Sequence, residues 1–135
     1  MNQFWQNEYV LAAAKYSVII LCIIVLLAVF ELVTKYKNWQ EIKNGNIAVA
    51  LTTGGKLLAI MNIFRFSIER NDSFFIMIGW GIFGFGLLFA GYFIFEFLTP
   101  TFKIDEEIEK DNRAVGLISM AILIGLSYVI GAGIT

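Results

Sequence analysis

The stretch YSVIILCIIVLLAVF, residues Tyr16–Phe30, decides the fold class, because it contains no charged side chain from end to end. An α-helix rises about 1.5 Å per residue, so about 20 such residues cross the roughly 30 Å hydrocarbon core of a bilayer. The apolar residues are continuous rather than alternating, which favours a helix over a barrel strand. We therefore predict a transmembrane helix from about Tyr16 to about Tyr36.

Three further apolar runs of similar length follow. The chain is 59% hydrophobic and 16% charged, with a mean hydropathy of +0.75. A soluble chain of 135 residues has too little interior to hide this much apolar surface. The composition predicts an all-α membrane protein of four transmembrane helices, forming a single membrane domain over residues 1–135. The later runs extend over about Asn46–Phe64, which is the least hydrophobic, about Phe74–Leu98 and about Ala114–Ile134.

The composition also argues against several functions. The formal net charge is −1, which leaves no basic excess to neutralise the phosphates of a nucleic acid. The chain has no histidine and one cysteine, Cys22, so it lacks the usual acid–base catalyst and the commonest metal ligand. We expect no enzyme activity, no cofactor and no metal. The expected partners are the lipid bilayer, a second copy of the chain, or another protein in the membrane or cytoplasm.

Basic residues gather near two of the three connectors between the spans. Cytoplasmic loops carry an excess of Lys and Arg. The charges predict that the first and third connectors are cytoplasmic and that both termini are outside. The residues near these two connectors are Lys35, Lys37, Lys43, Lys103, Lys110 and Arg113; those on the other side are Lys15, Arg65 and Arg70.

An internal similarity relates two halves of the chain. The segment Leu32–Ile60 aligns without a gap with Leu98–Leu126, at an offset of 66 residues. Matches in the polar connectors are informative, because membrane helices resemble each other by composition alone. The alignment predicts two tandem repeats of two helices, over about residues 16–64 and 74–134. Units with an even number of spans share one orientation, which makes the repeat parallel. The polar matches are Lys37 with Lys103, Glu41 with Glu107, and Asn46 with Asn112.

The matched segments share the pattern Glu-Ile-x-x-x-Asn-x-Ala-Val-x-Leu, over Glu41–Leu51 and Glu107–Leu117. This pattern resembles the bacterial membrane family catalogued as domain of unknown function 350, or uncharacterised protein family 0719, and the chain is similar to its Bacillus-type members. The resemblance covers nearly the whole chain. It implies a multi-pass protein of the bacterial inner membrane. It implies no activity, and so assigns no catalytic residues.

Lys56 is the most unusual residue, because it lies about ten residues into the second predicted span. A lysine at mid-bilayer costs roughly 2.5–3.5 kcal/mol on insertion scales. Thr52 and Thr53 make the same helix locally polar, and Glu31 and Glu96 are the nearest candidate counter-charges. These residues form a candidate intramembrane polar site that lines a pathway. The alternatives are a structural ion pair and a lysine that snorkels towards the interface.

Several other polar and small residues can be interpreted either structurally or functionally. Asn46 and Asn112 are expected to cap the helices that follow them, or to contact a cytoplasmic partner together with Glu41 and Glu107. Small residues four apart let membrane helices approach closely, so the pairs Gly86–Ala90 and Ala121–Gly125 predict packing within the bundle, with self-association as the alternative. The acidic run over residues 105–111 is expected to be a solvated connector.

Two functions remain open from the sequence. The first is a membrane-organising or partner-binding protein. The second is an oligomeric ion channel or small-solute transporter, with a polar pathway around Lys56. We favour the first, because four short helices with few buried charges make a poor solute cavity alone.

Overall fold

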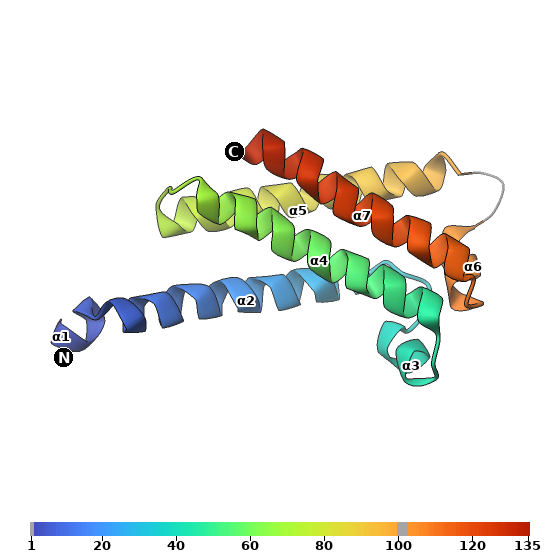
Figure 1. Ribbon diagram of the computed structural model, residues 1–135, viewed down its shortest axis with the longest axis horizontal. Helices are drawn as coiled ribbons and strands as arrows, with labels where there is room; N and C mark the ends of the chain where they lie inside the picture. The colour runs from blue at the N-terminus through green and yellow to red at the C-terminus, as the bar shows by residue number, and fades with distance from the viewer. Residues whose placement is uncertain (1, 100–102) are drawn as a thin grey trace.

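A computed structural model describes residues 2–99 and 103–135 of the chain. It contains four helices that are long and apolar enough to cross a membrane, which confirms the expected number of spans (Figure 1). Short helices lie before the first span and in two connectors. The long helices are α2 (Glu8–Leu32), α4 (Ile47–Glu69), α5 (Phe74–Phe97) and α7 (Arg113–Ile134), and the short ones are α1 (Asn2–Gln6), α3 (Asn38–Lys43) and α6 (Ile104–Glu109).

The first span differs from its predicted limits at both ends. α2 begins at Glu8 rather than near Tyr16, because Asn7 caps the helix by accepting a hydrogen bond from the backbone N–H of Tyr9 at 2.9 Å. The alanines that follow are strong helix formers and carry the helix into the apolar run. α2 ends at Leu32 rather than Tyr36, where the Thr34 hydroxyl donates to the carbonyl of Glu31 at 2.8 Å.

The burial of the four spans runs opposite to their hydropathy. α2 has the highest mean hydropathy, 2.7, and 17% of its most apolar window is buried; α4 has the lowest, 1.6, and 56% of its window is buried. Lipid accepts an apolar surface, so the helices that face it are the most apolar. α4 contacts α2, α3, α5, α6 and α7, and this central position allows it to carry polar side chains.

α4 and α7 share the most extensive helix–helix contact and run side by side in the same direction (Figure 1). Their backbones meet at two glycines. A Cβ atom on Gly55 would lie 2.8 Å from Cα of Met120, and one on Gly116 would lie 2.8 Å from the backbone of Ala48. Small residues at such crossings let backbones approach closely in lipid. These two glycines therefore set the spacing of the helix pair on which the bundle is built.

The predicted small-residue pairs are not at these contacts. A Cβ atom on Gly86 or Gly125 would meet nothing within 4 Å, and their companions Ala90 and Ala121 are exposed. The prediction that the two pairs pack within the bundle is wrong. The glycines that do make close contacts are opposite residues of other helices, and sequence spacing does not reveal those neighbours.

The connectors fold back onto the ends of the spans and form a second small core. Tyr36, Ile104 and Ile108 pack there against Ala48 and Val49 at the start of α4. The acidic run is therefore not wholly a solvated connector: Asp105 is buried, because the apolar positions on either side of it hold α6 against the bundle.

Positions 66 residues apart adopt the same local structure at this end of the bundle. α3 and α6 begin at Asn38 and Ile104. Gly45 and Asp111 both have a left-handed backbone, with φ of 86° and 64°. The asparagine that follows each caps the next span.

We expect the two contact glycines to tolerate no added methyl group. Gly55→Ala and Gly116→Ala should each lower the free energy of unfolding by about 1–3 kcal/mol, the usual cost of overpacking. The matched variants Gly54→Ala and Gly125→Ala add the same atom where nothing lies within 4 Å and should leave stability unchanged. Thermal unfolding in mild detergent measures all four. Equal losses for Gly54→Ala and Gly55→Ala would contradict this account of the α4–α7 contact.

Candidate functional site: a buried polar cluster around Lys56

Lys56 lies inside the bundle rather than at a lipid-facing surface. Its side chain is 0% exposed. Side chains on a helix tilt towards its amino terminus, and the ammonium group accordingly reaches towards the connector end. There Nζ lies 4.7 Å from the centroid of the Phe30 ring and 5.8 Å from that of Tyr36. Aromatic ring faces attract a cation, so these rings partly replace the lost hydration.

Three carboxyl groups are close enough to this ammonium group to interact with its charge. They belong to Asp105 in α6, Glu31 in α2 and Glu96 in α5. Glu31 and Glu96 are each the last residue but one of their helices. A carboxylate at a helix carboxyl end is unfavourable, because the helix dipole is negative there. Lys56 supplies the positive charge that these two helix ends and Asp105 require.

Several polar side-chain atoms of this region are buried without a hydrogen-bond partner. In the described part of the chain, Lys56 Nζ is one of six buried side-chain N and O atoms that have no hydrogen-bond partner. We call this set, together with Glu96, the Lys56 cluster. Ser119 lies beside Tyr92. The unpaired atoms are Glu31 Oε1, the hydroxyl oxygens of Tyr36 and Tyr92, Lys56 Nζ, Asp105 Oδ1 and Ser119 Oγ.

Tyr36 is the member of the cluster that lies in the first connector. Burial, and then the negative groups near it, raise the pKa of its hydroxyl above the ordinary value. The hydroxyl therefore keeps its proton at neutral pH and remains a hydrogen-bond donor.

Comparison with known proteins identifies the family. The family described as Domain of Unknown Function (DUF350) matches residues 4–134. The chain belongs to the DUF350 family. It is also 61% identical over 134 residues to the UPF0719 transmembrane protein YshE of Bacillus subtilis (strain 168), covering 99% of this chain and 100% of that protein. No solved structure matches the chain significantly. The resemblance noted in the sequence is confirmed.

Two of the residues expected in the polar site of this DUF350 protein lie beside the cluster rather than in it. The Thr53 hydroxyl accepts a hydrogen bond from the Asn38 side-chain amide at 2.9 Å, which ties α3 to α4. The Thr52 hydroxyl donates to the carbonyl of Ala48 in its own helix at 3.0 Å. Both groups are satisfied and hold the structure together, whereas Glu31 and Glu96 are within electrostatic range of Lys56 and make no ion pair with it in the described part of the chain.

The paired asparagines and glutamates form matching caps in the DUF350 fold. Asn46 accepts from the backbone N–H of Val49 at 3.0 Å, and its amide donates to Glu41 at 3.3 Å. Asn112 accepts from the backbone N–H of Val115 at 3.3 Å, and its amide donates to Glu107 at 3.2 Å. Each glutamate is therefore engaged in fixing the start of a span.

Sequence reasoning missed four members of the cluster. The sequence predicts that Asp105 belongs to a solvated run, and Tyr36, Tyr92 and Ser119 have no distinguishing pattern. One signal was available: Ile104 and Ile108 are spaced to pack α6 on the bundle, and Asp105 lies between them. The other three come from segments distant in sequence, which no local pattern reports: Tyr36 from the first connector, Tyr92 from α5 and Ser119 from α7.

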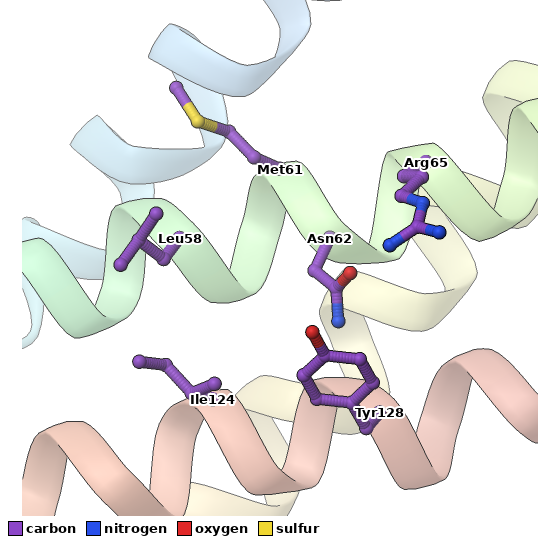
Figure 2. A pocket seen from close by; sticks show the side chains of 6 residues that line it. All are labelled: Leu58, Met61, Asn62, Arg65, Ile124 and Tyr128. Atoms are coloured by element: carbon purple, nitrogen blue, oxygen red, sulfur yellow. The ribbon is translucent and has the colours of Figure 1, made fainter.

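A separate groove of about 330 Å³ lies between α4 and α7. Figure 2 shows Asn62 of α4 and Tyr128 of α7 pointing towards one another across it. The Asn62 amide donates to Ser127 Oγ at 3.0 Å. Leu58, also in its lining, points about 200° around the helix from Lys56, so the groove and the cluster occupy opposite faces of α4.

We expect the two neighbouring threonines of α4 to respond differently to the loss of their hydroxyls. Thr53→Val leaves the buried Asn38 amide without its acceptor and should cost about 1–3 kcal/mol of unfolding free energy. Thr52→Val removes a bond within one helix turn, to a carbonyl that keeps its helical partner, and should cost under about 1 kcal/mol. An unfolding titration with SDS in mixed micelles gives both values. Equal costs would contradict the anchoring role assigned to Thr53.

Proposed function

We propose that the protein organises the membrane by assembling with a second copy of itself, through α2, and has no catalytic activity of its own. The observation that carries this proposal is the position of α2. Its buried residues, Ile19, Ile23, Leu27 and Phe30, all lie in its carboxyl-terminal part. The amino-terminal part extends away from the other spans (Figure 1), so in the described part of the chain no other span covers this length of α2, whose neighbour is the short helix α1.

The residues of this free part suit a contact with another helix. Ala12, Ala13, Ala14 and Ser17 are small and exposed, and small residues allow close packing and interhelical hydrogen bonds in lipid. A second copy presents the same surface, so a twofold contact would satisfy both chains. A cytoplasmic partner docked on the connectors has less support, because Glu41 and Glu107 are already bonded to Asn46 and Asn112.

We also propose that the chain consists of two tandem parallel repeats in the bacterial inner membrane, with its termini outside. The matching caps and left-handed residues 66 positions apart support the duplication. The basic residues near the first and third connectors support the orientation. The termini lie at one end of the bundle and α3 and α6 at the other (Figure 1).

A second candidate function is an ion or small-solute pathway, and the unpaired polar atoms around Lys56 favour it. Lys56 is fully enclosed, so such a pathway would need the bundle to open. If it exists, Lys56→Leu should abolish proton flux into liposomes that carry a trapped pH-sensitive dye. Unchanged flux with that variant would exclude Lys56 as a pathway residue.

The α2 contact is tested by cross-linking. Both variants are made in a Cys22→Ser background. Ala13→Cys places a thiol on the free part of α2, near the start of that helix, and the control Ala132→Cys places one on the exposed face of α7, near its end. Oxidation in membranes should give a disulfide-linked dimer for Ala13→Cys and little for Ala132→Cys. A disulfide needs a Cα–Cα separation of roughly 4.4–6.8 Å, which two α2 helices reach only when they pack side by side. Dimers from Ala132→Cys alone would place the contact on another helix and contradict the proposal.

A further inference from the structure

The groove between α4 and α7 changes in character from one end to the other. Leu58 and Ile124 lie towards one end and Arg65 lies at the other (Figure 2). Tyr128 is level with Asn62, one helical turn before Arg65, because the Asn62 amide donates to Ser127, the chain neighbour of Tyr128. The groove is therefore apolar at its deep end, carries a hydroxyl in the middle, and ends on a positive charge.

The charged end of the groove lies at the edge of the hydrocarbon core. α4 has 23 residues, and at 1.5 Å per residue it is about 34 Å long, slightly longer than a core of roughly 30 Å. Arg65 lies one turn before the end of α4 at Glu69, so its side chain reaches the level at which the lipid headgroups begin. Leu58 lies about 10 Å deeper along the helix axis, among the acyl chains.

Arg65 has hydrogen-bond donors available for an anion. A guanidinium group carries five N–H donors, and its planar fork matches two oxygens of a phosphate. In the described part of the chain only the donor on Nε is engaged, by Glu69 at 3.2 Å. Both side chains of this pair are exposed, and exposed ion pairs contribute little. The guanidinium group extends from α4 in the direction of α7 (Figure 2), which places its remaining donors beside the groove.

We propose that this groove binds one phospholipid from the leaflet on the side of the termini. The phosphate accepts hydrogen bonds from Arg65, the Tyr128 hydroxyl donates to an ester carbonyl, and an acyl chain lies against Leu58 and Ile124. Phosphate, ester and hydrocarbon follow one another along a phospholipid in the same order as these side chains follow one another along the groove. The site goes beyond the proposed assembly through α2 and does not depend on it.

Other occupants match the groove less well. Its volume of about 330 Å³ is within the usual range for small-ligand sites. A helix from a second copy is about 10–12 Å wide with its side chains, too wide for a groove of this volume that extends about 10 Å. A free phosphate ion would leave the apolar end unused, and a neutral lipid would leave the guanidinium group without a phosphate.

Native mass spectrometry tests the site on the delipidated full-length protein, titrated with phosphatidylglycerol in detergent micelles. We expect wild type to bind one phosphatidylglycerol, and Arg65→Gln to bind it roughly tenfold more weakly, because a charged hydrogen-bonding partner is lost. The control Arg113→Gln removes an arginine of nearly equal exposure, 65% against 63% for Arg65, at the opposite end of the bundle, and should bind as wild type does. Diacylglycerol, which has the same chains without the phosphate, should compete poorly.

A second pair of variants tests the apolar end. Leu58→Trp fills the groove and should weaken phosphatidylglycerol binding. Leu117→Trp adds the same ring at a position of α7 with similar exposure, 51% against 53%, outside the groove, and should not.

Three outcomes would overturn the proposal. The first is equal binding of phosphatidylglycerol and diacylglycerol by wild type, which needs no variant to fold. The second is an equal loss of binding in Arg65→Gln and Arg113→Gln, which would show a diffuse charge effect. The third is a dimer of wild type that Leu58→Trp dissociates, which would place a second copy of the chain in the groove.

Discussion

The close contact between α4 and α7 is the constraint on which the rest of the bundle depends. Gly55 and Gly116 let the two backbones meet without intervening side chains, which is how membrane helices gain packing energy where no hydrophobic effect drives them together. With this pair fixed, α5 packs on both helices and α2 packs mainly on α4. The connectors α3 and α6 then close over the ends at which α4 and α7 begin.

The central position of α4 explains why the least apolar span is also the most buried. In lipid, an outward-facing polar group has no partner, whereas one that faces neighbouring helices can be bonded or compensated. Thr53 accepts a hydrogen bond from Asn38, and Lys56 is within electrostatic range of the carboxyl groups at the ends of α2 and α5. The charge that looks costly in the sequence thus holds two helix ends that would otherwise place negative charge against negative dipoles. Loss of Lys56 would leave those ends repelling each other.

The Lys56 cluster and the anchored part of α2 are related through Phe30. This residue belongs to the buried stripe that fastens α2 to the bundle, and its ring also covers the Lys56 ammonium. Phe30 therefore takes part both in the anchoring of α2 and in the enclosure of Lys56.

The sequence by itself determined the class of protein, the number of spans and the unusual character of Lys56. These follow from the length of apolar runs and from the cost of a charge in hydrocarbon, both of which are local properties. It also indicated the capping residues Asn46 and Asn112, since a cap acts on its own helix. The tertiary structure alone decided which glycines make contact, that Asp105 is buried, and that Tyr36, Tyr92 and Ser119 join Lys56. Those outcomes depend on which faces of distant helices meet. In a membrane-spanning helix the lipid-facing and helix-facing sides are both largely apolar, so the sequence does not distinguish them.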